Sequence, residues 1–221
     1  MLPLRDNIPS ATRPTLTWLL IAANVVAFLW ELSGADVLPL TLVPARFISD
    51  PAGNAATILT AMFLHGGWLH LLGNMLYLWI FGDNVEDRLG HGRYLFLYLA
   101  GGVAAAFAQV AIAPDSRIPM LGASGAIAAV LGAYIVLYPR ASVYTWVPIF
   151  FGIIPIPAMV WLGLWFVLQL LSGVVSLGAA SSGGVAFFAH VGGFIAGVVL
   201  VKLLDRGPRW RPGARPLTTM P

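Results

Sequence analysis

Cysteine is absent from the 221-residue sequence, which excludes disulfide bonds and cysteine-ligated metal sites. Charge is also scarce, because 10% of the residues are Asp, Glu, Lys or Arg, against roughly 25% in soluble domains. The chain is instead 59% hydrophobic, with a mean hydropathy of +0.85. It contains 24 glycines, a residue that is more frequent in membrane helices than in soluble ones. This composition indicates a membrane protein.

Six apolar runs approach the roughly 20 residues that a helix needs to cross the hydrocarbon core of a bilayer. Their limits are 15–32, 61–81, 94–112, 120–138, 158–177 and 184–203. We therefore predict an all-α membrane protein with a six-transmembrane-helix bundle over 15–205. A short segment, 1–14, precedes the bundle, and a basic, proline-rich tail, 206–221, follows it and is expected to be disordered.

The apolar stretch 139–157 is a special case among the connectors. Pro148, Pro155 and Pro157 would break a helix there. We predict an interfacial or re-entrant connector rather than a seventh span.

Basic residues are distributed unevenly between the two sides that six spans create. One side carries only Arg46 and Arg117, and the other carries ten: Arg5, Arg13, Arg88, Arg93, Arg140, Lys202, Arg206, Arg209, Arg211 and Arg215. Because positive loops stay in the cytoplasm, both termini are predicted to be cytoplasmic. The net charge of +3 is then a sign of topology, so we expect contact with the lipid bilayer and no nucleic-acid partner.

Four polar residues lie at similar depth in three of the predicted spans. Ser124 is near the start of the fourth span and His190 near the start of the sixth, while His70 and Asn74 are in the second. All three spans enter from the same side in this topology. Polar side chains inside a membrane are costly and therefore mark candidate functional sites.

Small residues follow Ser124 and His190 at helical intervals. Ala128 and Gly132 continue the face of Ser124, and Gly193 and Gly197 share a face with His190. Such stripes let two membrane helices approach closely, which would bring the serine hydroxyl within reach of the imidazole. A base of this kind activates serine as a nucleophile. No acidic residue lies in the spans at this depth, so the pattern predicts a dyad.

His70 and Asn74 are spaced i, i+4 and project from one side of their helix. Both can donate hydrogen bonds to the negative charge that develops on a carbonyl oxygen during acyl transfer. The backbone around Ser124, from Gly122 to Gly125, is assigned to the same oxyanion site.

These residues carry a family resemblance. GASGA around Ser124, His190 followed by VGGFIAG, and HGGWLHLLGN ending at Asn74 resemble the signatures of rhomboid intramembrane serine proteases. The opening PLRDNIPS and the run TWLLIAANVVAF are similar to bacterial members. The family's usual Trp-Arg pair in the first connector is not evident, and PARF over 44–47 is its nearest counterpart.

The resemblance implies a six-helix fold and a Ser124–His190 dyad that cuts transmembrane helices of other proteins near the outer face. It implies no cofactor and no metal, and a multi-pass location in the inner membrane of a bacterium. It also implies a lateral gate at the fifth span, beside which we predict a mobile cap over 176–184. Glu86 and Arg88, in a connector similar to the family's (82–90), are predicted to brace that connector. The oligomeric state is not predicted.

Other interpretations stay open at this stage. A serine alone in a membrane helix is more often a packing residue than a nucleophile, and Asn74 alone could bridge two helices. A metalloprotease would use His65, His70 and His190, but no H-E-x-x-H motif is present, and a helical spacing of five would make His65 and His70 diverge. His65 and His91 are interpreted as structural. A catalytically inactive rhomboid-like protein that binds membrane helices is the main alternative function.

Overall fold

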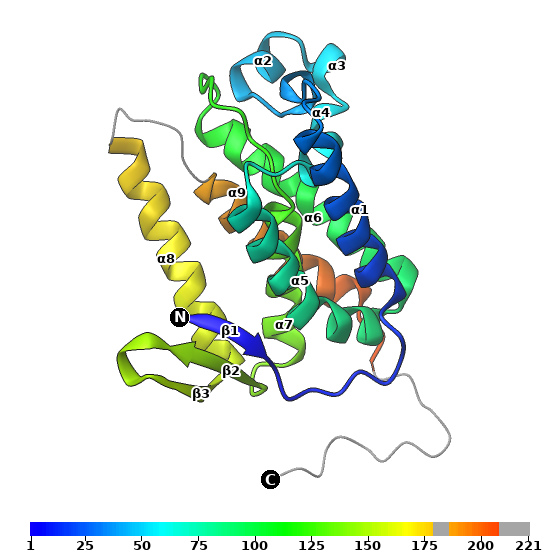
Figure 1. Ribbon diagram of the computed structural model, residues 1–221, viewed down its shortest axis with the longest axis vertical. Helices are drawn as coiled ribbons and strands as arrows, with labels where there is room; N and C mark the ends of the chain where they lie inside the picture. The colour runs from blue at the N-terminus through cyan, green and yellow to red at the C-terminus, as the bar shows by residue number, and fades with distance from the viewer. Residues whose placement is uncertain (179–185, 208–221) are drawn as a thin grey trace.

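The computed structural model describes residues 1–178 and 186–207, and this part of the chain is mostly helical (Figure 1). Its six long helices are α1 (Thr15–Leu32), α5 (Trp68–Leu89), α6 (His91–Ile112), α7 (Ser124–Leu137), α8 (Ala158–Gly178) and α9 (Phe187–Leu204). Between α1 and α5 lie η1 (Leu38–Leu40), α2 (Pro44–Ser49), α3 (Pro51–Asn54), α4 (Thr57–Thr60) and η2 (Ala61–Phe63). The predicted cap (176–184) lies outside the described residues from 179 on, and the predicted tail (206–221) from 208 on.

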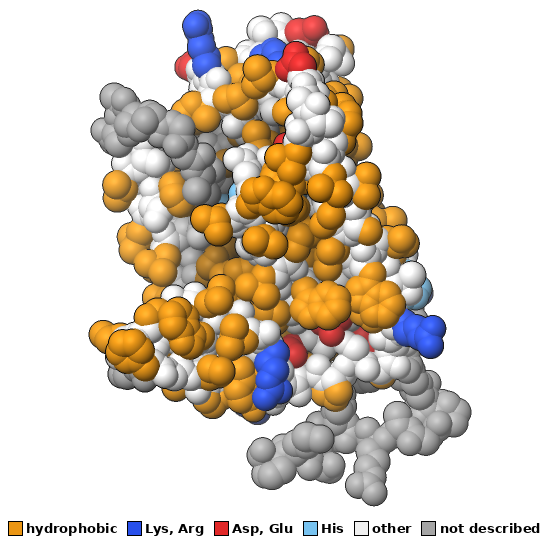
Figure 2. Space-filling model, in the orientation of Figure 1, with side chains coloured by type: hydrophobic (Ala, Val, Ile, Leu, Met, Phe, Trp, Pro, Cys, Tyr) orange, Lys and Arg blue, Asp and Glu red, His pale blue; other side chains and the backbone are white. Residues whose placement is uncertain are grey.

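Four helices, α1, α6, α8 and α9, are each long and apolar enough to cross a membrane. A fifth span results if α5 is joined to the bent segment before it, and α7 is apolar but has only 14 residues. In Figure 2 charged side chains gather at the two ends of the molecule, and a hydrophobic band lies between them. The helices thus form a membrane bundle, while the number of six spans remains a prediction.

Helix α7 lies inside the bundle. Every residue from Ala126 to Tyr134 is buried, because α5, α6 and α9 pack around it. Helix α8 lies at the edge of the bundle in Figure 1 and exposes most of its apolar side chains. Because other helices surround α7, it is apolar on every side.

The second predicted span, 61–81, differs from the structure at both ends. The chain bends by 79° between the segment Pro51–Phe63 and α5. Gly67, with φ of 151°, lies at the bend, in a conformation that favours glycine. At the other end α5 continues to Leu89, and a single residue, Gly90, with φ of 78°, separates it from α6. The interval 82–93 between the second and third predicted spans is therefore not a connector, because its polar residues continue α5 beyond the apolar part of that helix.

The predicted helical bundle is confirmed in its main part, but the described residues are not all helical, because three strands form an antiparallel sheet. These are β1 (Leu2–Arg5), β2 (Ser142–Val147) and β3 (Gly152–Pro157), in the order β1-β2-β3. The segment 139–157 is thus a hairpin, with the turn η3 (Pro148–Phe150) between its strands. Its prolines do exclude a helix, but Pro155 and Pro157 are accommodated in β3, an edge strand whose outer N–H positions need no partner.

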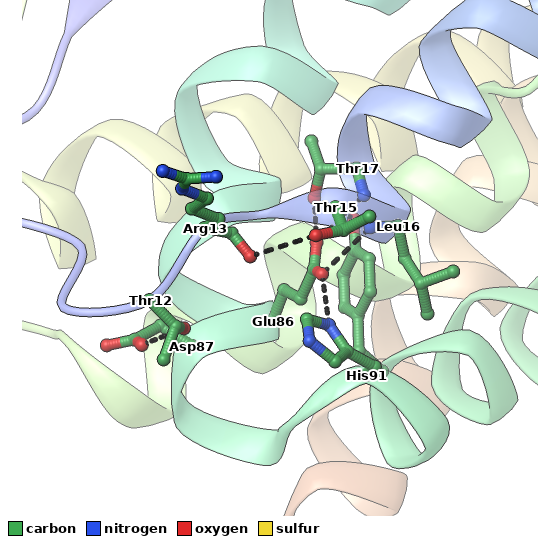
Figure 3. A network of polar contacts seen from close by, with 9 residues as sticks. Thr12, Arg13, Thr15, Leu16, Thr17, Glu86, Asp87 and His91 are labelled. Atoms are coloured by element: carbon green, nitrogen blue, oxygen red, sulfur yellow. Dashed lines mark hydrogen bonds and ion pairs between the residues drawn. The ribbon is translucent and has the colours of Figure 1, made fainter.

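The carboxylate of Glu86, which is buried, connects α5 to the start of α1 (Figure 3). It accepts hydrogen bonds from the backbone N–H groups of Leu16 and Thr17 at 2.9 and 2.8 Å, and from Thr17 Oγ1 at 2.7 Å. Since α1 has no side-chain cap at Pro14, Glu86 satisfies donors at the positive end of this helix. His91 Nδ1 lies 2.6 Å from Glu86 Oε1 and joins α6 to the same network.

Further contacts hold the N-terminal segment and the end of α9. Arg88 donates two hydrogen bonds to Asp205, at 2.9 and 2.8 Å, and these hold the pKa of Asp205 below its usual value.

The N-terminal segment 1–14 is held by contacts with α5 and α7. Thr12 donates to Asp87, as Figure 3 shows. Tyr134 Oη donates to Asp6, whose pKa is raised by burial to about 6. Segment 1–14 is therefore an ordered segment that contacts α5 and α7.

The small-residue stripes bring α7 and α9 into backbone contact. A Cβ added at Gly197 would lie 1.9 Å from the carbonyl oxygen of Ala129, and one at Gly193 would lie 2.2 Å from that of Gly125. On α7, a Cβ at Gly132 would lie 2.1 Å from the carbonyl oxygen of Phe194. Each distance is far below van der Waals contact. Glycine at these positions therefore sets the spacing of the two helices that carry Ser124 and His190.

Replacing Gly197 with alanine is expected to lower stability by about 1–3 kcal/mol, since the methyl group can only be placed by separating α7 from α9. The matched control is Gly163→Ala on α8, where an added Cβ meets no atom within 4 Å among the described residues. That control should be neutral or stabilising by up to about 1 kcal/mol, because glycine weakens a helix interior. The measurement is the melting temperature in detergent. Equal effects of the two changes would contradict close packing at Gly197.

Candidate active site

A cavity of about 1360 Å³ lies among α5, α7, α8 and α9. Its lining includes His70 and Asn74 from α5, Ser124 from α7, Gln169 from α8 and His190 from α9. Figure 2 shows the surface hollowed between the side chains of α8 and those of the rest of the bundle. All four polar residues predicted from the sequence therefore line one cavity.

Ser124 and His190 are in hydrogen-bond contact across the junction of α7 and α9. Ser124 Oγ lies 2.7 Å from His190 Nε2. Ser124 is the first residue of α7, and His190 lies in the first turn of α9, where it is 8% exposed. If the hydroxyl donates its proton, Nε2 must be the unprotonated nitrogen of a neutral imidazole. This is the arrangement in which imidazole can remove the proton of a serine hydroxyl.

The other side of the His190 ring is contacted by α8. His190 Nδ1 lies 2.8 Å from Gln169 Oε1, and the ring of Trp165 lies against the imidazole with 6.0 Å between centroids. Gln169 was not predicted from the sequence, although one signal could have revealed it. It is the only amide or charged residue in the run 158–171, and a polar side chain in such a run is itself a candidate for function.

His70 and Asn74 present potential donors to the cavity. His70 Nδ1 accepts the backbone N–H of Gly66 at 3.3 Å, so in the neutral ring the proton is on Nε2. Asn74 Nδ2 is buried and has no hydrogen-bond partner among the described residues. A buried amide donor without a partner is costly. Both groups are therefore available to an acceptor that enters the cavity.

Backbone donors lie beside these side chains. The first intrahelical bond of α7 runs from Ile127 N–H to Ala123 O, so the N–H of Ser124 belongs to the first turn, where no intrahelical acceptor exists. Gly122 has φ of 125°, and a Cβ there would lie 2.7 Å from His70 Nε2. A Cβ at Gly125 would lie 2.7 Å from that of Ala105. These glycines let the chain before Ser124 pass close to His70 and let α7 pack on α6.

The position of His65 relative to His70 differs from the predicted one. It precedes α5 rather than lying on it, so the helical spacing does not apply, and its ring lies 5.1 Å from that of His70 instead of diverging. Its backbone N–H donates to Glu31 at 3.0 Å. Within residues 1–178 and 186–207 no group of three or more histidine, aspartate or glutamate side chains is placed to hold a metal ion.

The family model described as the Rhomboid domain matches residues 52–206. Among similar proteins, Rhomboid protease GluP of Bacillus subtilis is 40% identical over 58% of this chain and 26% of its own length. Rhomboid protein 1, mitochondrial, of Saccharomyces cerevisiae is 28% identical over 83% of this chain and 51% of its own. RHOMBOID-like protein 12, mitochondrial, of Arabidopsis thaliana is 34% identical over 71% and 48%. The chain thus spans about half or less of the length of these relatives.

The comparison corrects the predicted location. The two relatives that match over the larger shares of this chain are mitochondrial proteins, whereas the match to the bacterial protease covers a smaller part. The expected location in a bacterial inner membrane is therefore wrong. The cytoplasmic assignment of the termini belonged to the same prediction and falls with it.

Proposed function

The chain belongs to the rhomboid family, and on this premise we propose that it is an intramembrane serine endopeptidase that hydrolyses peptide bonds in or near transmembrane helices of other proteins. The observation that carries the proposal is the 2.7 Å contact between Ser124 Oγ and His190 Nε2, within a cavity that also holds His70 and Asn74. The relative called a protease supports the same chemistry.

In the proposed reaction Ser124 Oγ attacks the carbonyl carbon of the scissile bond while its proton passes to His190 Nε2. The tetrahedral intermediate collapses when the C–N bond breaks and His190 returns that proton to the departing amine nitrogen. A water molecule then attacks the acyl-enzyme, giving one proton to His190, and the carboxylic acid leaves as Ser124 regains its proton. One peptide bond and one water become an acid and an amine.

The negative oxygen of the intermediate is proposed to accept hydrogen bonds from His70 Nε2, Asn74 Nδ2 and the N–H of Ser124. This assignment is supported because none of the three donors has a hydrogen-bond acceptor among the described residues. The N-terminal end of α7 adds the positive end of a helix dipole at the same place. Donors arranged before the reaction stabilise the transition state more than the substrate.

The substrate is proposed to be a membrane-spanning segment that reaches the cavity between α5 and α8. Helix α8 lies at the edge of the bundle, and its contact with α5 includes the ring of Trp161, which lies 5.7 Å from that of Tyr77. Both α5 and α8 line the cavity beyond this contact. Lipid is the medium from which a segment would enter.

The proposal is tested with the purified chain in liposomes that contain a panel of single-span proteins. Mass spectrometry of the products should locate cuts in or near the spans. A serine-directed phosphonate should stop the cleavage, and a metal chelator should leave it unchanged. Binding of the substrates without any cut would instead favour a catalytically inactive rhomboid-like protein, and inhibition by the chelator alone would favour a metalloprotease.

A further inference from the structure

Helix α8 supplies a polar partner to the nitrogen of His190 that does not face Ser124. The distance from His190 Nδ1 to Gln169 Oε1 is 2.8 Å, a normal hydrogen bond. Trp165, one helical turn before Gln169, lies against the same ring. The imidazole is therefore held on one side by the serine of α7 and on the other by two residues of α8.

The chemistry of imidazole gives this contact a consequence. A neutral ring has one N–H, and the nitrogen that carries it is decided by the partner of that nitrogen. An amide oxygen beside Nδ1 favours the proton there, and leaves Nε2 free to accept the proton of Ser124. The described lining of the cavity contains no Asp, Glu, Lys or Arg, and its titratable side chains are His70, Tyr77 and His190. No carboxylate in that lining competes for this role.

We propose that Gln169 is a positioning residue for His190, one that selects the Nδ1–H tautomer and fixes the orientation of the ring. The inference rests on the proposed function, in which His190 is the base. The site is then a triad with a neutral third member instead of a dyad. Because Gln169 belongs to α8, the orientation of the base depends on α8 remaining packed against α9.

Two substitutions separate positioning from packing. Gln169→Leu keeps the approximate volume but removes the acceptor, and Gln169→Glu keeps an acceptor and adds charge. If Gln169 positions His190, the leucine variant should lose about 10- to 100-fold in kcat, by analogy with the loss of partners that orient metal-binding histidines, with little change in KM. The glutamate variant should be more active than the leucine variant. The acidic limb of its pH–rate profile should move to higher pH, since a carboxylate stabilises the imidazolium.

A pure packing role predicts the opposite order. Leucine would then be tolerated in an apolar helix, and glutamate would lower both stability and activity. The matched control is Gln109→Leu, which removes the other glutamine that contacts α9, where its Oε1 accepts the backbone N–H of Ala189 at 3.2 Å. This control should leave the protonation pattern of His190 unchanged.

The direct readout is the pair of ¹⁵N chemical shifts of the His190 ring in uniformly labelled protein, assigned with a His190→Gln variant. The shifts should show one Nδ1–H tautomer in the wild type and in Gln169→Glu, and a mixture in Gln169→Leu. An unchanged tautomer in Gln169→Leu, or a kcat within threefold of wild type, would overturn the inference. The NMR readout is independent of proteolysis, so a wild type with the expected tautomer but no hydrolysis would support this inference and refute the proposed function.

Discussion

Replacing Ser124 with alanine should abolish cleavage of a transmembrane substrate, with a loss in kcat of roughly 10⁴–10⁶-fold, the range known for serine proteases that lose a member of their catalytic group. His190→Ala should have an effect of similar size, because the hydroxyl is a weak nucleophile without a base at 2.7 Å. The double variant should be little worse than either single one, since nucleophile and base act as a unit.

Stability measurements complete this first prediction. Both variants should melt near the wild-type temperature, since Ser124→Ala removes one oxygen from the edge of a cavity. Ser172→Ala provides the matched control, because it also replaces a serine in an apolar helix, here α8, outside the cavity lining. It should retain full activity. Comparable turnover by Ser124→Ala and wild type would refute the serine mechanism.

The second large effect concerns His70 and Asn74. Loss of one donor to the oxyanion typically lowers the rate by 10²–10³-fold, which is about 3–4 kcal/mol. His70→Ala and Asn74→Ala should therefore each lower kcat by about this factor while changing substrate binding little. Both should remain more active than Ser124→Ala, because the nucleophile and its base are intact.

A role in packing alone would give a different pattern. Asn24→Ala is the matched control, since Asn24 is a buried asparagine on α1 whose Nδ2 donates to Leu20 O at 2.7 Å, away from the cavity. It should lose stability and keep its kcat. If Asn74→Ala behaved like Asn24→Ala, with a lower melting temperature and normal turnover, Asn74 would not belong to the oxyanion site, and the same holds for His70→Ala.

Much of the site could be predicted because helical spacing carries spatial information. Gly193 and Gly197 are four residues apart and share a helix face with His190, and a stripe of this kind has few uses other than close helix packing. The contact between Ser124 and His190 follows once α7 and α9 are brought together. His65 was misplaced for the opposite reason, because a helical spacing was applied across the bend at Gly67.

Other features were beyond the sequence or were overlooked in it. The strand β1 pairs with β2, which lies more than a hundred residues later in the sequence. The four residues of β1 contain no local pattern that predicts this pairing. The polar end of α5 was interpreted as a connector because charge excludes it from lipid, although contacts such as that of Glu86 with α1 stabilise a helix there. Gln169 was visible in an apolar run but had no predicted partner.

The activation of Ser124 by His190 is tested most directly by covalent labelling with a fluorophosphonate, followed by peptide mass mapping. This reagent reports whether one serine among all others is activated. We expect a single adduct, on Ser124, which forms much more slowly in His190→Ala and not at all in Ser124→Ala. An adduct on a different serine, or labelling of Ser124 at an equal rate in the absence of His190, would contradict this activation.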